Sequence, residues 1–302
     1  MSLEKFKDKN YTPNASTAEE LNKAHKDGES LTGLYLAKAD LRNSYLVDAD
    51  MSGCDLTKTN LSESSMYGIN LSGSNLFKAD LEGANLKNAN LERCNLLGAN
   101  LTDAKLEGVN WGKDCKVINE IEADELASRG ETRLANEKYK EAEHIYRTVK
   151  ISLQSQTLGD DTGEFFMREM VVIRKQLPMF SLGRLWSKII DITTGYGEKI
   201  GNIVYTIVGI IVACAFLYGI EGVKYGDHTL GFFNGHMEQY GGFLNTIGDL
   251  LYFSVVVYST VGFGEIVPLG PLGKTIMVFE GMVGGLVLAI LIIAMYKKSM
   301  DR

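Results

Sequence analysis

The sequence lacks paired cysteines, a strong basic charge and an apolar N-terminal segment. Its four cysteines, Cys54, Cys94, Cys115 and Cys214, lie far apart and form no CxxC pair, which argues against a disulfide framework or a zinc site. The net charge of −7 provides no overall basic surface, so we expect no nucleic-acid partner. Residues 1–8 are charged without an apolar core, so we expect no signal peptide and a cytosolic first part. No nucleophile–base pair, metal cluster or phosphate-binding loop is evident, and we therefore expect neither an enzyme nor a cofactor.

Apolar residues make up 45 % of the 302-residue chain, which is long enough for two or three domains, but they are unevenly distributed. Between residues 31 and 111 a Leu or Met stands at every fifth position. The series consists of Leu31, Leu36, Leu41, Leu46, Met51, Leu56, Leu61, Met66, Leu71, Leu76, Leu81, Leu86, Leu91, Leu96, Leu101 and Leu106, and Trp111 closes it. Asp or Asn usually precedes each of them, and a small residue often stands two positions before. A period of five fits neither an α-helix nor a strand, and a short fixed period predicts a solenoid of stacked repeats.

This A(D/N)LXX pattern resembles the pentapeptide-repeat family. The resemblance implies a right-handed square β-helix with four pentapeptides in each coil, so residues 31–111 would form about four coils, roughly 19 Å long at ~4.8 Å per coil. The small and the Leu positions would form interior ladders, with Cys54 and Cys94 in small slots, while the other three positions face solvent. Some members of the family are acidic mimics of DNA, but the excess of acidic residues here is slight. We therefore expect regulation, assembly or the docking of a cytoplasmic protein partner.

The middle of the chain is rich in helix-forming residues. Residues 120–176 weakly resemble tetratricopeptide-type helical hairpins, in which Gly159 and Gly163 separate one helix from the next. Residues 182–192 are amphipathic and partly basic and include a Trp, which favours a helix at the cytoplasmic membrane interface. We expect the Gly-rich residues 194–198 to form an elbow into the membrane.

Two long apolar segments predict membrane spans. Residues 200–220 carry no charge, residues 275–296 are interrupted only by Glu280, and each segment can cross a ~30 Å hydrocarbon core. Several Lys and Arg residues precede the first segment, and Lys297 and its neighbour follow the second. The positive-inside rule then places both termini in the cytoplasm, while residues 221–274 face outward or re-enter the membrane. We expect an integral protein of the cell membrane, either plasma or inner.

Between these spans, an apolar run from about Asn245 to Ser259 leads into the sequence Thr-Val-Gly-Phe-Gly. The run is too short to cross a bilayer but long enough for a re-entrant helix, and irregular backbone at membrane depth is tolerated where it lines a watery cavity. A dehydrated K⁺ ion needs a cage of oxygens, which a ring of backbone carbonyls supplies. Gly262 and Gly264 allow successive carbonyls to aim at one axis, while Val261 and the following Phe turn their side chains into the protein. Taken alone, the five residues also fit a Gly-rich turn after a buried strand.

In this setting the segment resembles the pore helix and selectivity filter of the two-span potassium channel family. The resemblance assigns the ion-binding filter to Thr260, Val261, Gly262, Phe263 and Gly264, with K⁺ bound at the first four. It also implies a homotetramer in the lipid bilayer, in which K⁺ is the permeant ion. Glu265 follows the filter where Asp is commonest. Phe263 lacks the hydroxyl of the usual Tyr, and Val257 stands where a Thr often braces the filter.

The second span contains two further candidates. Gly284 has the family's spacing from the filter to an inner-helix hinge, so we expect a gating hinge at Gly284 and Gly285, with helix packing as the alternative. Glu280 is the one ionisable residue within a span. We expect it, like Glu265, to support the filter, either by bonding pore-helix donors or by lying protonated against the first span. A direct role in conduction or pH gating is the alternative. A remote alternative for the outward loop is a metal site made of Asp227, His228, His236 and Glu238.

The sequence therefore predicts a multidomain chain with a β-helix, an α-helical hairpin linker and an all-α two-span pore domain. The expected domains are an N-terminal cap (1–30), the pentapeptide-repeat β-helix (31–115), helical hairpins (116–180), an interfacial helix with its elbow (181–199) and the pore domain (200–302). We expect a potassium-selective channel with a cytoplasmic repeat module. The alternatives are a nonselective cation channel of the same fold and a membrane-anchored interaction protein. No calcium site, nucleotide loop or Arg-rich voltage-sensing helix indicates what opens the pore.

Overall fold

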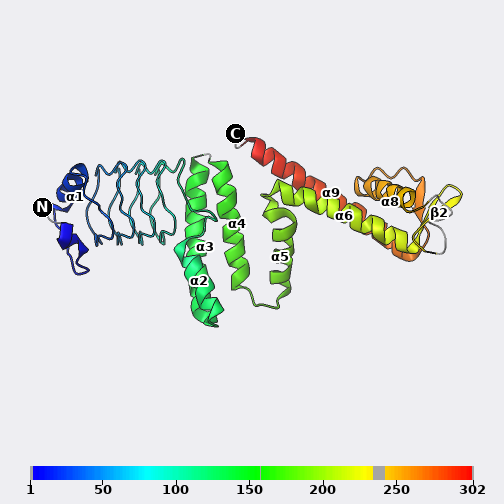
Figure 1. Ribbon diagram of the computed structural model, residues 1–302, viewed down its shortest axis with the longest axis horizontal. Helices are drawn as coiled ribbons and strands as arrows, with labels where there is room; N and C mark the ends of the chain where they lie inside the picture. Colours follow the sequence, from blue (N-terminus) through cyan, green and yellow to red (C-terminus); the bar gives the residue numbers. More distant parts are fainter. Residues whose placement is uncertain (1–2, 157, 234–241, 301–302) are drawn as a thin grey trace. The chain divides into compact units, whose positions relative to one another are not determined.

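The computed structural model describes residues 3–156, 158–233 and 242–300 (Figure 1). The chain divides into two compact units between Lys188 and Ile189. The first unit contains η1 (Leu3–Lys7), α1 (Thr17–Lys26), the repeats, α2 (Ile118–Ser128), α3 (Thr132–Ser155) and α4 (Gly159–Gln176). The second contains η2 (Gly195–Gly197), α6 (Ile200–Glu221), β1 (Val223–Tyr225), β2 (His228–Leu230), α8 (Phe243–Tyr258), β3 (Ile266–Pro268) and α9 (Pro271–Met300). Helix α5 (Leu182–Thr194) continues across the division.

The repeats wind into stacked coils. Parallel β-bridges join residues that are twenty apart, from Tyr35 with Asp55 to Asn90 with Asn110. Each coil therefore holds four pentapeptides, and backbone hydrogen bonds link each coil to the next. The second residue after each Leu or Met has a positive φ, whether or not it is Gly, so the chain turns once in every pentapeptide.

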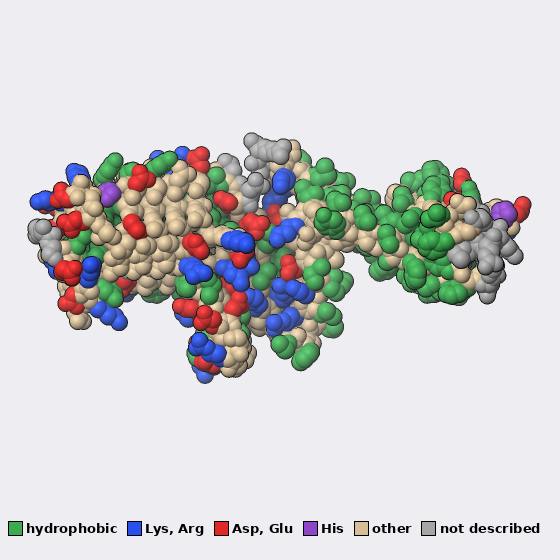
Figure 2. All heavy atoms as spheres, in the orientation of Figure 1, with side chains coloured by type: hydrophobic (Ala, Val, Ile, Leu, Met, Phe, Trp, Pro, Cys, Tyr) green, Lys and Arg blue, Asp and Glu red, His purple; other side chains and the backbone are tan. Residues whose placement is uncertain are grey.

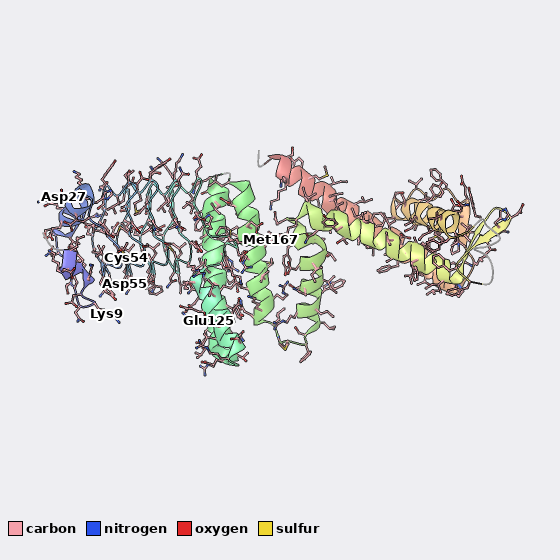
Figure 3. All side chains as sticks on the ribbon, in the orientation of Figure 1. Lys9, Asp27, Cys54, Asp55, Glu125 and Met167 are labelled. Carbon is pink, nitrogen blue, oxygen red and sulfur yellow. The ribbon has the colours of Figure 1, made fainter. Side chains whose placement is uncertain are left out.

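Small polar side chains inside the coils find a repeating partner. The central Leu and Met side chains and the small residues two positions earlier are buried. From Cys54 onward, a small residue that carries a hydroxyl or thiol donates to the carbonyl 23 residues earlier, as in Thr59 to Leu36 at 2.8 Å and Cys94 to Leu71 at 2.9 Å. The hydroxyl of Ser44, in the first coil, has no such bond within the described residues. Burial raises the pKa of the Cys54 thiol to about 11 and that of Cys94 to about 12, so both thiols are protonated core residues. Figure 3 labels Cys54 among the coils.

Both ends of the coiled stack are covered. At the first end, Phe6 and Leu21 are buried in the same hydrophobic core as the coils. At the second end, the Trp111 ring meets the edge of the Phe165 ring, with the two ring centroids 4.9 Å apart. The apolar interior of the repeats is therefore covered at both ends by other parts of the chain.

Helices α2, α3 and α4 pack as consecutive antiparallel neighbours, and Gly130, with φ +81°, makes the turn between α2 and α3. Glu120 is fully buried and accepts hydrogen bonds from Tyr146 on α3 (2.5 Å) and Lys175 on α4 (2.9 Å). Burial opposes the ionisation of Asp124, but hydrogen bonds from Lys175 and Tyr139 outweigh it and lower the pKa of that carboxyl. These polar contacts join the three helices.

In the second unit, α6 and α9 are long and apolar enough to cross a membrane. Hydrophobic side chains cover most of the visible surface of α6, α8 and α9 (Figure 2). The two long helices run antiparallel, because Ile203 near the start of α6 packs with Ala294 near the end of α9. At the same end, Lys297 forms an ion pair with Glu198. The antiparallel sheet has the strand order β2-β1-β3.

Candidate functional site

Helix α8 positions the segment expected to bind ions. It has 16 residues, a length of about 24 Å, which is less than the ~30 Å hydrocarbon core. Its buried side chains Leu250, Phe253 and Val257 pack against α6. The helix begins after Gly242, whose φ is +97°, and ends at Tyr258. It is a short apolar helix held against a long one.

The chain reverses directly after α8. The Thr260 amide donates to the carbonyl of Val257 at 2.9 Å, and the Val261 amide donates to that of Val256 at 3.1 Å. The segment then continues to β3, which pairs with β1. Residues 259–265 are thus fixed at one end by the last turn of α8 and at the other by the sheet.

The backbone of this segment alternates. Thr260, Gly262 and Gly264 have positive φ values of 59°, 59° and 76°, and the two residues between them do not. A positive φ is common for Gly but strained for a β-branched residue such as Thr. Strain of this kind gathers at functional sites, which makes Thr260 a candidate in its own right.

Residues 260–264 are all exposed. Within the described residues, none of their backbone carbonyl oxygens accepts a hydrogen bond, whereas the amides of residues 260–262 are bonded to α8. Backbone carbonyls away from water ordinarily have partners. The segment therefore presents a row of acceptors to the outside of the single chain.

The side chains of this segment differ from expectation. Val261 and Phe263 are 54 % and 65 % exposed instead of turning into the protein. The segment is not packed tightly within one chain: beside it lies a cavity of about 220 Å³, which is lined by residues of α8, by β3 and by Met277 of α9. Glu265, just before β3, is itself exposed.

Glu280 on α9 joins three helices. It is fully buried and accepts a hydrogen bond from Tyr218 on α6 at 2.7 Å. It also bonds Ser254 on α8, whose hydroxyl lies 2.9 Å from the Ile211 carbonyl of α6. The Cys214 thiol on α6 is a further hydrogen-bond partner. These partners are 26 to 66 positions away in the sequence, and only the polar character of Ser254 within an apolar run hinted at them.

The two glycines of α9 have different surroundings. A Cβ on Gly284 would lie 2.4 Å from the Tyr258 carbonyl at the end of α8, which is too close for any side chain. A Cβ on Gly285 would meet nothing within 4 Å. Gly284 therefore allows α9 to approach the end of α8, which fits the alternative that this glycine serves helix packing. A gating hinge at Gly284 and Gly285 remains a prediction.

An acidic cap that sequence reasoning missed ties α6 to α9. The Glu221 carboxylate at the end of α6 accepts hydrogen bonds from the amides of Leu272 and Gly273, at the N-terminus of α9. Negative charge is favourable there because the amides are unpaired and the helix dipole is positive. A Cβ on Gly270 would lie 1.9 Å from the same carboxylate. This cap fixes the chain that follows β3.

The remote metal alternative finds no support in the described part of the chain, which contains no group of three or more metal-binding side chains. Asp227 and His228 lie at the β1–β2 turn and on β2. His236 and Glu238 lie outside the described residues.

Two protein-family models match the chain. The family described as "Ion channel" matches residues 222–298, which include α8, the segment 259–265 and most of α9. The chain joins an ion channel domain to pentapeptide repeats. The repeats, in eight copies, occupy residues 35–73 and 74–110. Neither family consists of enzymes, and with the two long apolar helices the match indicates a membrane protein.

Solved structures that are similar to the chain include pentapeptide repeat proteins of cyanobacteria. One is alr5209 from Nostoc Pcc 7120, with 32 % identity over 30 % of this chain and 74 % of that chain, and a TM-score of 0.27. Another is Rfr23 from Cyanothece 51142, with 41 % identity over 27 % of this chain and 58 % of that chain, and a TM-score of 0.17. No curated protein matches the chain.

Proposed function

We propose that the chain is a potassium-selective channel, in which residues 260–264 of several copies line one pore. The observation that carries the proposal is the alternation of φ at Thr260, Gly262 and Gly264, together with the row of carbonyls that no described residue binds. Alternating the sign of φ turns successive carbonyls toward the same side of a strand. Such a row replaces the water shell of K⁺ at Thr260, Val261, Gly262 and Phe263. K⁺ enters as the permeant ion, and no other cofactor is proposed.

The pore requires several copies, because one chain supplies one row of carbonyls. Closed cyclic symmetry brings identical rows around one axis, and by resemblance to two-span potassium channels we propose a homotetramer. The exposure of Val261 and Phe263 supports this arrangement, since neighbouring copies would cover them. The C-terminus of α8 would then direct the negative end of its dipole toward the ion path. Glu265 and Glu280 support the filter, and Gly284 with Gly285 forms the gating hinge.

The remaining assignments are part of the same proposal. Coils of four pentapeptides support a right-handed square β-helix within residues 31–115, capped by residues 1–30 and followed by hairpins in 116–180. Residues 181–199 form the interfacial helix and elbow, and 200–302 form the pore domain. The exposed Lys199 and the lysine pair at 297–298 support a cytoplasmic location for both termini of a protein of the cell membrane. There the repeats would dock or assemble with a cytoplasmic protein.

Ion flux tests this proposal. Full-length protein in liposomes should carry K⁺ but little Na⁺ down equal gradients. Gly262→Ala should abolish the flux, because Ala is strained at φ +59°. Gly209→Ala is the matched control, since its added Cβ in α6 meets nothing within 4 Å and its φ is not positive. Equal K⁺ and Na⁺ flux would favour the nonselective channel, and normal flux in G262A would contradict the filter.

A closed gate would also give no ion flux, so a second measurement is needed. K⁺ bound in the filter stabilises the assembled protein whether or not the gate is open. The thermal midpoint of the assembly should therefore be higher in K⁺ than in Na⁺, and G262A should remove this difference. A midpoint that is equal in both salts, together with no flux, would favour the membrane-anchored interaction protein.

A further inference from the structure

The turns of the coiled repeats place exposed side chains in rows. Each coil turns once in every pentapeptide, and the next coil repeats the same positions twenty residues later. Turn residues that are twenty apart therefore stand in a row along one edge of the stack, at steps of about 4.8 Å. Two neighbouring edges of the stack carry charges of opposite sign.

One edge is a row of lysines. Lys38, Lys58 and Lys78 occupy the same turn position in three successive coils, and all three are exposed. The ion pairs within residues 31–111, which the structure describes throughout, do not include any of them. Lys78 lies over the ring of Phe77, with its ammonium nitrogen 5.2 Å from the ring centroid. Three like charges in a row repel one another, so this lysine edge favours a surface of negative charge.

The next edge along each coil is acidic. It carries Glu63, Glu82 and Asp103, which belong to the second, third and fourth coils and are all exposed. Glu82 accepts a hydrogen bond from the Asn100 side chain at 3.2 Å, but no ion pair within the described repeats neutralises these three carboxylates. The one cation at this edge, Arg42 in the first coil, is already paired with Asp40 on the same chain.

A flat face joins the lysine edge to the acidic edge. Its central row consists of the bridged residues Asp40, Asn60, Asp80 and Asn100. Helix α1 does not cover this face, because its side chains bond the backbone at Tyr45 and Val47, which lie beyond the acidic edge. The face therefore has a positive border, a polar centre and a negative border.

We propose that this face binds the same face of a second copy of the chain, with the two stacks parallel and related by a twofold axis along their length. This rotation exchanges the two borders of the face, so the lysine edge of each copy meets the acidic edge of the other. It also keeps the height along the stack. Lys58 of one copy then meets Glu63 of the other, and Lys78 meets Glu82, because the members of each pair belong to the same coil.

The occupant is a second copy because the acidic edge matches the lysine edge in both spacing and height. The stacks are parallel because identical chains that cross one membrane share one orientation. In this respect the inference rests on the proposed assembly of several copies. A single exposed ion pair contributes little. Chains that are already held together have an effective concentration of about millimolar, so a weak contact is sufficient.

The same rotation places Asp40 and Asp80 opposite their own counterparts. Asp40 is paired with Arg42, and Asp80 accepts a hydrogen bond from Asn100 at 3.0 Å. Packed sheets lie about 10 Å apart, which exceeds the screening length of about 8 Å at physiological ionic strength. Opposite charges at the two borders can approach much more closely, so attraction at the borders outweighs repulsion at the centre.

Paired charge reversals test this contact. Lys58→Glu with Lys78→Glu makes both borders acidic, and Glu63→Lys with Glu82→Lys makes both borders basic. A carbodiimide couples an amine to a carboxylate that touches it. Neither double variant alone can couple position 58 to 63, or 78 to 82, because both members of each pair then carry the same charge. When the two full-length variants are co-expressed with different tags, these couplings can form only between copies.

We expect mass spectrometry of the co-expressed variants, purified through both tags in detergent micelles, to find the couplings of 58 to 63 and of 78 to 82. Lys87 and Glu107 form an ion pair within the chain, so their coupling is the positive control for the reagent in every sample. Copies that purify together and couple Lys87 to Glu107, but neither of the two tested pairs, would overturn the paired repeats and leave the channel proposal standing.

Two other outcomes are equally informative. Variants that fail to purify together would contradict the assembly of copies on which this inference and the homotetramer both depend. If the lysine edge of the unaltered protein is coupled to a different protein and not to a second copy, the occupant is an acidic partner and the pairing is wrong.

Discussion

The Glu280 side chain offers the sharpest mutational test of how the second unit is held together. Its carboxyl is fully buried between α6, α8 and α9 and bonds Tyr218 and Ser254. Glu280→Gln keeps the shape of the side chain and provides an oxygen for Tyr218 and an N–H for Ser254. Glu280→Leu fills a similar volume but makes neither bond. The two variants therefore separate hydrogen bonding from packing.

The loss of folding stability expected in Glu280→Leu depends on which buried polar group is left without a hydrogen-bond partner. In Glu280→Leu, Ser254 still has the Ile211 carbonyl at 2.9 Å, so the Tyr218 hydroxyl bears most of the loss. A buried unpaired donor costs about 1–3 kcal/mol in soluble proteins, but hydrogen bonds between membrane helices average only ~0.6 kcal/mol and reach ~1.7. With several bonds meeting at one carboxyl, we expect about 1–2 kcal/mol, a factor of roughly 5–30 in the folding equilibrium.

Equilibrium unfolding of the full-length protein in mixed micelles measures this cost. Glu280→Gln should unfold at the same denaturant concentration as the unaltered protein, and Glu280→Leu should unfold earlier. Adding Tyr218→Phe to Glu280→Leu should restore much of the loss, because two apolar partners leave no buried hydroxyl unpaired. If Glu280→Gln were as unstable as Glu280→Leu, the negative charge rather than the hydrogen bonds would hold the helices, and this reasoning would be wrong.

Three further predictions concern other parts of the chain. Gly284→Ala should prevent normal assembly, because its Cβ would lie 2.4 Å from the Tyr258 carbonyl. Gly285→Ala should assemble normally, since its Cβ would meet nothing within 4 Å. Gel-filtration profiles with equal defects in the two variants would contradict this packing role of Gly284. The buried Cys94 thiol, with a pKa of about 12, should react with maleimide at neutral pH only after unfolding, and rapid labelling of folded protein would refute the interior position. The pKa of Asp124 in the folded protein is below its ordinary value of 3.8, so the ionised carboxylate stabilises α2–α4 at every pH above 3.8. This stabilisation should be lost as the pH falls through the lowered pKa. Unfolding followed by circular dichroism that shows stability unchanged by acid, or higher in acid than at neutral pH, would contradict it.

Features set by local pattern were open to prediction from the sequence. The five-residue period identifies the repeats, because each residue's place in a coil depends on its own position in the period. Two charge-free or nearly charge-free segments identify α6 and α9, because a bilayer requires a fixed apolar length. The helical region was anticipated as residues 120–176 with a break at Gly159 and Gly163. The structure begins α4 at Gly159, but Gly163 lies within α4, where its φ is not positive, and a further break occurs at Gly130, whose positive φ follows the end of α2.

Features set by distant contacts were not open to prediction. Nothing near Glu280 in the sequence indicates Tyr218, which is 62 positions away and joins it only when α6 and α9 pack. The Glu221 cap on α9 likewise spans more than fifty residues. The inward position expected for Val261 and Phe263 stays a prediction, because the sequence pattern describes an assembled pore and the exposure of these side chains is that of a single chain.

The most direct test of the central claim is the reversal potential of the full-length protein in a planar bilayer with K⁺ on one side and Na⁺ on the other. If the carbonyls of residues 260–264 replace the water shell of K⁺, the current should reverse at a potential at which the K⁺ side is negative. We expect about 59 mV for each tenfold preference for K⁺ over Na⁺. A potential near zero with measurable current would show that the pore does not distinguish the ions, and would contradict a potassium-selective filter at Thr260–Gly264.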